Sequence, residues 1–376
     1  MKTIHYNNLD LMRLIFALFV IVSHSYPISG NPSGDLLSRL TGGQIMFSSI
    51  GVDGFFIISG FLIFNSLKYS KSTADYIWKR CLRIYPALFV VIVLTIIMGY
   101  FVSGMSFFEY FWGNVSARTY LINNLSLYSL QWSIAGVFDG NVLPGTINGS
   151  LWTLVYEFSL YFLIMLAGLG SILGRRFGQA LAVATVFATA YLALNYKDAL
   201  NVREFFWGLN FYQLCYLSSL FVFGSLLASL RFNEWSGLRW YCLGSAAVLV
   251  LAVILNIYTV VLHLVLPVFI ISLGYSFINR ASIQYSKIGD LSYGVYIYAF
   301  PIQQLLMHLF QLGTLELMIY SAGLALACGY MSWNLVESRA MKYKSVFADF
   351  HSKELARTSV PATESPARAN SAQVST

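Results

Sequence analysis

Charged residues are scarce in this sequence of 376 residues, because Asp, Glu, Lys and Arg together make up only 10% of it, against 57% hydrophobic residues. A composition so poor in charge and so apolar indicates a membrane protein rather than an ordinary soluble domain. Cysteine is also rare, and the four cysteines stand singly, without the paired spacing of a zinc site or a disulfide framework. The sequence therefore predicts packing roles for the cysteines, no metal site and no metal cofactor.

Long apolar runs are abundant. A helix needs about 20 apolar residues to cross a hydrocarbon core of about 30 Å. Ten such runs are present, at 9–27, 49–68, 82–103, 150–170, 179–196, 211–230, 238–256, 258–278, 291–312 and 315–337. The first lacks a small-residue cleavage site, so we predict a retained helix and not a signal peptide. The expected fold is an all-α polytopic membrane bundle of about ten transmembrane helices. Residues 1–345 would form the membrane domain and residues 346–376 a polar, disordered cytoplasmic tail.

Positive charge is unevenly distributed between the predicted loops. Lys and Arg residues close to helix ends stay on the cytoplasmic side of a membrane. With the amino terminus inside, 18 of the 23 Lys and Arg residues fall in inner segments, four fall in outer segments and Arg13 lies within the first run. We therefore predict that both termini are cytoplasmic. The net charge of +7 is then a consequence of topology and not a sign of nucleic-acid binding.

Two ionisable residues interrupt the first run, "LDLMRLIFALFVIVSHS". An ionisable side chain inside a span is costly, so its presence points to function. Arg13 and His24 are eleven residues apart and would project from the same helix face, separated by about 16 Å along the axis. Arg13 is expected near the cytoplasmic boundary and His24 near the outer one. The alternatives are an arginine that snorkels to the headgroups and a hydrogen-bonded interfacial histidine.

Two carboxylates accompany later runs. Asp53, in "GVDGFFIISGFLI", is expected at the depth of His24, where it could accept from one ring nitrogen and leave the other free as a base. A water-exposed helix cap is the alternative for Asp53. Glu157, in "NGSLWTLVYEFSLYFL", falls about two turns into the fourth run, where it could carry a proton or form a hydrogen bond between helices. Glycines at 51, 54 and 60 predict close helix packing.

A pair of arginines precedes the third run, in "WKRCLRIYPAL". Arg80 and Arg83 are three residues apart and would share one helix face at the cytoplasmic mouth. Guanidinium groups suit phosphates because each presents a planar fork of donors to two oxygens. The alternative is that the two arginines only anchor the helix at the cytoplasmic surface of the membrane.

Six segments, in order from about residue 5 to 345, carry a resemblance to a known family. They are the Arg-x10-His run, "GVDGFFIISGFLI", "RCLRIYPAL", "GSLWTLVYE", "LSYGVYIYAFPIQQ" and "WNLVESRAMKY". Together they resemble the acyltransferase-3 family of bacterial integral membrane acyltransferases. The resemblance implies an O-acyltransferase of the bacterial inner membrane that moves an acyl group, usually acetyl, from cytoplasmic acetyl-CoA to an extracytoplasmic glycan. Acceptors of this kind, as the resemblance implies, are lipopolysaccharide O-antigen, capsule, exopolysaccharide and peptidoglycan.

The resemblance also implies roles for particular residues. The expected catalytic residues are His24, Glu157 and Asp53, and the expected donor-binding residues are Arg13, Arg80 and Arg83. His24 would act as general base on the acceptor hydroxyl or would itself be transiently acylated, and Glu157 or Asp53 would orient it. Ala299 stands where many members carry histidine, so no role of that histidine applies here. Without a fused soluble domain, acyl delivery would occur in the membrane domain or through a separate periplasmic partner.

A transporter or flippase for a lipid-linked sugar or a small anionic substrate is the alternative function. The same intramembrane charges would then line a substrate path and relay protons. Many transporters show an internal duplication of their hydropathy pattern, which this sequence lacks. The sequence therefore favours the enzyme.

Overall fold

The computed structural model describes residues 7–169, 174–201, 208–277 and 280–346, and all regular structure within these ranges is helical. The long helices are α1 (Leu9–Ile28), α3 (Phe47–Lys68), α4 (Thr73–Ser103), α7 (Trp152–Leu169), α8 (Arg175–Asn195), α10 (Phe211–Ser229), α11 (Leu238–Ile254), α12 (Tyr258–Ser276), α14 (Ser292–Phe310) and α15 (Thr314–Ser332). The short ones are α2 (Leu36–Leu40), α5 (Phe107–Trp112), α6 (Ala117–Ser126), α9 (Lys197–Leu200), α13 (Arg280–Ile288) and α16 (Ser338–Ala340).

Each of the ten predicted runs overlaps one of these long helices. Eight helical segments of the described chain are long and apolar enough to cross a membrane, which confirms a multi-pass membrane protein. Helix α11 has only 17 residues, and the tyrosines and glutamines of α14 dilute its apolar character. The count of ten spans and the cytoplasmic termini therefore stay predictions. The predicted tail lies, from residue 347 on, outside the described residues.

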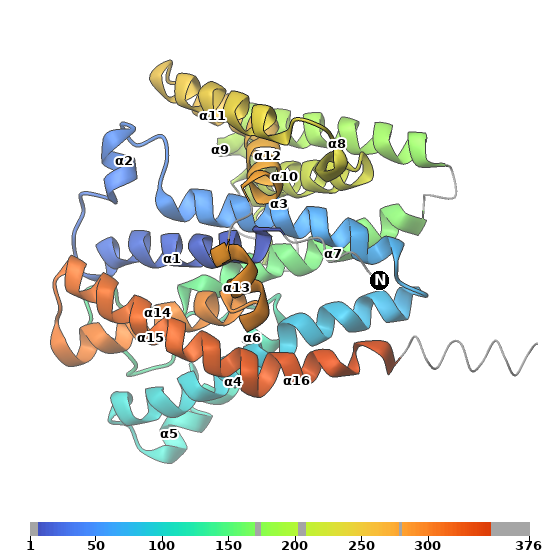
Figure 1. The fold of residues 1–376 in the computed structure, drawn as a ribbon. Coiled ribbons are helices and arrows are strands. Elements are labelled where there is room, and N and C mark those ends of the chain that lie inside the picture. The colour runs from blue at the N-terminus through green and yellow to red at the C-terminus, as the bar shows by residue number, and fades with distance from the viewer. Residues whose placement is uncertain (1–6, 170–173, 202–207, 278–279, 347–376) are drawn as a thin grey trace, which may run out of the picture.

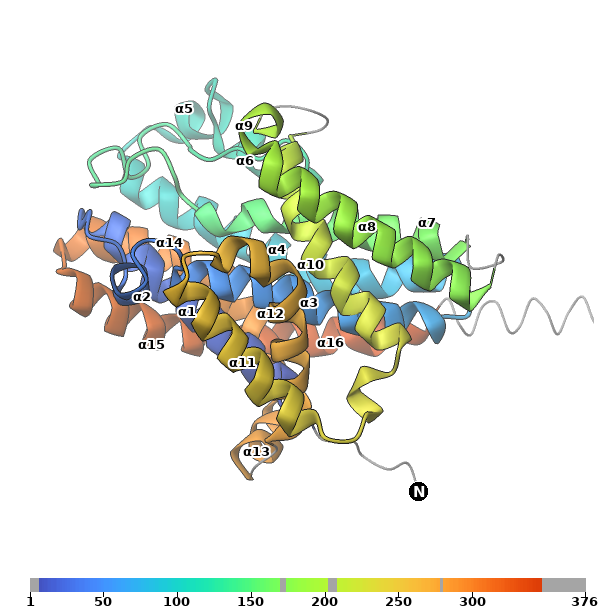
Figure 2. The same ribbon diagram turned by 90° about the horizontal axis from the view of Figure 1, so that it is seen from above.

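The long helices pack in three layers (Figures 1 and 2). Helices α1, α3 and α7 form the middle layer. Helices α8, α10, α11 and α12 cover one side of it, where α10 packs along α3, and α4, α14 and α15 cover the other, where α14 packs along α1. Residues far apart in the sequence thus meet around α1, the helix that carries Arg13 and His24.

Two glycines of α3 make the close helix contacts that the sequence predicts. A Cβ atom at Gly51 would lie 2.7 Å from the backbone oxygen of Phe16 in α1, and one at Gly60 would lie 1.9 Å from the backbone oxygen of Phe221 in α10. Only glycine allows both neighbours to approach α3 this closely. Helix α3 therefore fixes the position of α1 relative to α10.

Most residues of helix α14 are buried, and amide side chains hold the helix in place. The Gln303 Nε2 donates to the backbone oxygen of Ile21 in α1 at 3.0 Å. The Gln304 Nε2 donates to the backbone oxygen of Thr146 at 2.6 Å, and the Asn148 Nδ2 donates to that of Ile297 at 3.0 Å. In a membrane interior such amides need partners, because water does not reach them. The bonds lock α14 between α1 and the segment that leads into α7.

Helix α4 begins earlier than the predicted third run. It begins at Thr73 and not near residue 82, and the Ser72 hydroxyl caps it by accepting from the Asp75 backbone N–H at 3.1 Å. The prediction was wrong because hydropathy marks only the apolar part of a helix, whereas the cap marks its start. As a result, Arg80 and Arg83 lie two to three turns inside a regular helix.

Candidate active site

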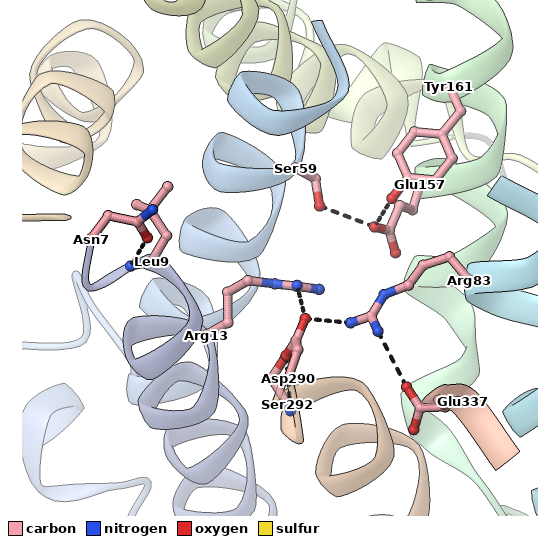
Figure 3. A network of polar contacts seen from close by, with 10 residues as sticks. All are labelled: Asn7, Leu9, Arg13, Ser59, Arg83, Glu157, Tyr161, Asp290, Ser292 and Glu337. Atoms are coloured by element: carbon pink, nitrogen blue, oxygen red, sulfur yellow. Dashed lines mark hydrogen bonds and ion pairs between the residues drawn. The ribbon is translucent and has the colours of Figure 1, made fainter. Parts of the chain in front are cut away.

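An ion-pair network joins three helices near the first turns of α1 (Figure 3). The Asp290 carboxylate, just before α14, accepts through Oδ2 from Arg13 of α1 and from Arg83 of α4. Its Oδ1 accepts from the backbone N–H and the hydroxyl of Ser292. One carboxylate therefore connects two cations that the sequence predicts to bind the donor and ties both to the start of α14.

A second carboxylate completes this ion-pair network. Glu337 is buried and accepts through Oε2 from the Arg83 Nη1 at 3.2 Å, while its Oε1 accepts from the Ser332 hydroxyl at 2.9 Å. The π-helical turn Trp333–Glu337 follows α15 directly. Such turns often occur at functional sites. Arg13, Arg83, Asp290 and Glu337 together form the ion-pair network.

Asp290 lies outside the membrane-spanning helices, and its pKa shows how its surroundings favour the charged form. Burial alone would raise the pKa of this carboxyl. The guanidinium groups of Arg13 and Arg83 and the bonds from Ser292 outweigh burial and hold the pKa of Asp290 below its usual value. The carboxylate is therefore charged at neutral pH and neutralises part of the positive charge around it.

Arg80 has different surroundings from Arg83. Its guanidinium lies over the ring of Tyr161, 5.8 Å from the centroid, and its Nη2 donates to the Ser66 hydroxyl at 3.3 Å. No carboxylate of the described chain forms an ion pair with it, and its Nε is buried without a hydrogen-bond partner. Arg80 therefore retains donor capacity that the protein itself does not use.

Glu157 lies at the arginine end of the site. It accepts from the Ser59 hydroxyl at 3.0 Å and from the Tyr161 hydroxyl. With Arg13 it lines a small cavity of about 30 Å³ between α1, α3, α7 and α14, which suffices for one or two water molecules. We name this the arginine cavity. No hydrogen bond joins Glu157 to His24 in the described chain, so the expected contact by which Glu157 would orient His24 is absent.

His24 lies at the other end of α1 and lines a much larger cavity, of about 580 Å³. We name this the histidine cavity; its lining is Ser23, His24, Tyr26, Pro27, Gly30, Asn31, Pro32, Gly34, Asp35, Met46 and Ser48. The His24 Nδ1 is buried and has no hydrogen-bond partner, and the ring meets that of Phe300 edge-on at 5.3 Å. A buried nitrogen without a partner is costly and marks a candidate functional group.

Asp35 is the carboxylate that lies beside His24 in this cavity. It caps α2 by accepting from the Ser38 backbone N–H at 2.9 Å, and it also accepts from the Phe47 backbone N–H at 2.9 Å. A third bond comes from the hydroxyl of Ser23. These bonds hold the connection between α1 and α3 in shape, so Asp35 positions the wall of the histidine cavity.

Asp53, the residue expected to orient His24, faces another helix. Its Oδ2 accepts from the Tyr216 hydroxyl of α10 at 3.0 Å. The Tyr216 ring in turn packs edge-on against His263, whose Nδ1 lies 2.6 Å from the Ser219 hydroxyl oxygen. The predicted Asp53–His24 contact is therefore wrong, because Asp53 belongs to the face of α3 that packs on α10. A catalytic role for Asp53 remains a prediction.

Three aromatic residues of α14 lie between the two ends of the site. Tyr293 lies under the Arg83 guanidinium at 5.6 Å, Tyr296 packs against Phe55 at 5.5 Å, and Phe300 contacts His24. They follow one another at helical spacing on one face. The arginine cavity and the histidine cavity share no lining residue. In this conformation, aromatic side chains of α14 lie between them.

Sequence reasoning found the cations and missed their partners. Asp290 and Glu337 each lie at an end of an apolar run, and the predicted topology puts these ends on the same side as the arginines, which was the available signal. Neither lies deep inside a run, so the cost of a charge within a span did not mark either of them as functional. Asp35 was missed because it lies in a loop, away from any apolar run.

The chain was compared with known proteins. An acyltransferase domain model of the acyltransferase-3 family matches residues 6–333. An O-acetyl transferase of Shigella phage Sf6 is 30% identical over 358 residues, which cover 90% of this chain and 97% of the relative. Nodulation protein 10 of Rhizobium leguminosarum bv. viciae is 28% identical over 366 residues, covering 91% of this chain and 95% of the relative. No solved structure matches the chain. The protein is therefore a member of the acyltransferase-3 family of membrane acyltransferases.

Proposed function

We propose that this protein transfers an acetyl group from acetyl-CoA, bound on the cytoplasmic side of the bacterial inner membrane, to a sugar hydroxyl of an extracytoplasmic polysaccharide or glycolipid. Membership of the family and the similarity to an O-acetyl transferase support acyl transfer to oxygen. The observation that carries the rest is the arrangement along α1. Arginines gather at one end, and a histidine with an unpartnered nitrogen lines a large cavity at the other.

The arginine end suits the phosphate-bearing part of the donor. Arg13, Arg80 and Arg83 come from two helices, and the buried Nε atoms of Arg13 and Arg80 have no acceptor in the described chain. Phosphates present several acceptor oxygens to such donors. A thioester at the tip of a long flexible arm could then reach along α14 towards His24, about 16 Å further along α1. This requires the aromatic side chains between the two cavities to move apart.

The histidine cavity suits an uncharged sugar. Its volume of about 580 Å³ lies within the range of small-molecule sites, about 300–1,000 Å³. Tyr26, Asn31 and Ser48 supply an aromatic face, an amide and a hydroxyl, while no Lys or Arg is among its lining residues. The one lining carboxylate, Asp35, would repel an anionic acceptor. A neutral sugar hydroxyl placed beside His24 is the acceptor that this lining favours.

The proposed chemistry requires one base. His24 accepts the proton of the acceptor hydroxyl while the hydroxyl oxygen bonds to the acyl carbon of the thioester. The carbon–sulfur bond then breaks, and the proton passes from His24 to the sulfur of coenzyme A. In the second route that the sequence leaves open, a ring nitrogen of His24 bonds to the acyl carbon, the carbon–sulfur bond breaks, and coenzyme A leaves as the thiol with the imidazole proton. The acceptor hydroxyl oxygen then takes the acyl group from the imidazole, which regains a proton from that hydroxyl.

The test uses the full-length protein in lipid nanodiscs with labelled acetyl-CoA and surface polysaccharide from cells that lack the gene. We expect label in the polysaccharide with the native protein and none above background with His24→Ala. His308→Ala is the matched control, because His308 is an exposed histidine at the end of α14 that contacts only the ring of Phe138 among described aromatic side chains. Equal labelling by native protein and His24→Ala would overturn the proposal.

The same material separates the two routes. Without acceptor, an acyl-histidine intermediate leaves label on the protein in a single turnover, and this label disappears in His24→Ala. Unlabelled native protein that still acetylates the polysaccharide shows direct transfer.

A further inference from the structure

The ion-pair network contains as many carboxylates as arginines, which is unexpected for a site that binds a polyanion. Arg13 and Arg83 are matched by Asp290 and Glu337, and Glu157 lies close by across the arginine cavity. Of the three arginines expected to bind the donor, only Arg80 has no acidic partner in the described chain. Coenzyme A carries several phosphate charges, and such a nearly neutral group of side chains attracts them weakly.

Asp290 occupies the position between the two guanidinium groups where an anionic ligand would bind. Its Oδ2 accepts from Arg13 and from Arg83 at once, in the manner of a phosphate oxygen held by two cations. Its Oδ1 does not need the arginines, because the backbone N–H and hydroxyl of Ser292 already donate to it. Asp290 can therefore lose both arginine partners and stay anchored at the start of α14.

Two arginines of the proposed donor site also retain unused donors. The Nε atoms of Arg13 and Arg80 are both buried and unpartnered. Buried donors are normally satisfied, so this pair points to a ligand that brings more acceptor oxygens than one carboxylate has. A phosphate or a pyrophosphate group has more acceptor oxygens than a carboxylate.

We propose that Asp290 is a resident anion of the donor site, which holds Arg13 and Arg83 in place until donor phosphate replaces it on them. This inference rests on the proposed function, because it assumes that coenzyme A binds at these arginines. Asp290 is thus a positioning residue: it keeps two buried cations paired while the site is free of donor, and it competes with the donor for them. Removal of its charge should tighten donor binding rather than weaken it.

The experiment measures coenzyme A affinity and thermal stability for full-length native protein, Asp290→Asn and Asp75→Asn in nanodiscs. Asp75 is the matched control, a buried carboxylate in the first turn of α4 that pairs with Lys79 at 2.7 Å and does not contact the network. We expect Asp290→Asn to bind coenzyme A at least fivefold more tightly, to melt at a lower temperature without it, and to gain more stability from it than the native protein does. Asp75→Asn should change the affinity less than twofold.

Each outcome decides between the proposals. Native protein that binds no coenzyme A overturns the proposed function. Native protein that binds it, together with a folded Asp290→Asn whose affinity is unchanged or weaker, overturns the resident-anion proposal alone. If Asp290→Asn does not fold, Glu337→Gln serves instead, because it removes the other acceptor of Arg83. At least twofold tighter binding by Glu337→Gln then supports the exchange, and unchanged or weaker binding overturns it.

Discussion

The two ends of α1 differ in how far their polar groups are paired within the protein and in the size of the adjoining cavity. At the arginine end, Arg13 and Arg83 are paired with buried carboxylates, and the adjoining cavity holds only about 30 Å³. At the other end, His24 has a buried nitrogen without a partner and lines a cavity of about 580 Å³. The arginine end has a small cavity and two arginines paired with carboxylates, whereas the histidine end has a large cavity and a ring nitrogen without a partner.

This difference follows from the cost of each group in the membrane interior. An unpaired guanidinium buried away from water is far more costly than a neutral imidazole, so Arg13 and Arg83 require counter-ions in every state of the protein. A neutral imidazole without a hydrogen-bond partner costs less free energy than an unpaired guanidinium. Mutations at the arginine end should therefore change stability and donor affinity, while mutations at His24 should change only the rate of transfer.

The largest expected effect tests the histidine end. We expect His24→Gln to lower the transfer rate about 10²–10⁴-fold, because removal of a positioned base costs about that much. Coenzyme A affinity should change less than twofold, since the residue lies about 16 Å along the helix from Arg13. The rate of acetyl transfer and the coenzyme A dissociation constant, measured on the same nanodisc preparation, check this. A large loss of coenzyme A affinity would show that the histidine end also contributes to donor binding, against the division of roles between the two ends.

The second effect tests the arginine end for stability. Arg83→Ala leaves Asp290 and Glu337 without one of their cations, and breaking such buried pairs costs about 3–5 kcal/mol. We expect a clear fall in the melting temperature, measured by thermal unfolding in detergent. The double variant Arg83→Leu, Glu337→Gln should recover much of the loss, because it removes the carboxylate that is left unpaired and keeps the Arg13–Asp290 pair. A melting temperature that Arg83→Ala leaves unchanged would show that the ion-pair network does not hold the helices together.

The third effect separates two neighbouring arginines of α4. Arg80 has no carboxylate partner in the described chain, so Arg80→Gln should leave the melting temperature within a few degrees of native. It should weaken coenzyme A binding about tenfold, because hydrogen bonds to charged groups contribute about 1.5–3 kcal/mol each. Titration of coenzyme A and thermal unfolding of Arg80→Gln and Arg83→Ala side by side check this. If Arg80→Gln binds coenzyme A as well as native protein, Arg80 is only a membrane anchor.

The helices could be predicted from the sequence because hydrophobic length is a local property. Each of the ten apolar runs overlaps a long helix, and the packing role of Gly51 and Gly60 was also predictable, because small residues in spans mark close contacts. The start of α4 was missed, since its first turns are polar and are set by the Ser72 cap.

The cations and the histidine of the site could be predicted, but their contacts could not. The separation of Arg13 and His24 follows from helix geometry alone. Which carboxylate meets which cation depends on how distant helices pack, so Asp53 was assigned to His24 although it bonds to Tyr216 of α10. Asp290 was missed for the same reason, because 277 residues separate it from Arg13 in the chain.

The smallest expected effect compares the two ends by their response to salt. Raising the ionic strength from about 0.1 M to about 1 M shortens the Debye length from about 10 Å to about 3 Å. The KM for acetyl-CoA should rise severalfold, because the donor reaches Arg80 and the network through electrostatic attraction. The KM for the polysaccharide acceptor should change less than twofold, because the histidine cavity has no Lys or Arg among its lining residues and the oxygens of Asp35 are already hydrogen-bonded. An acceptor KM that rises with salt as steeply as the donor KM would mean that the acceptor is anionic and is bound by cations outside this cavity.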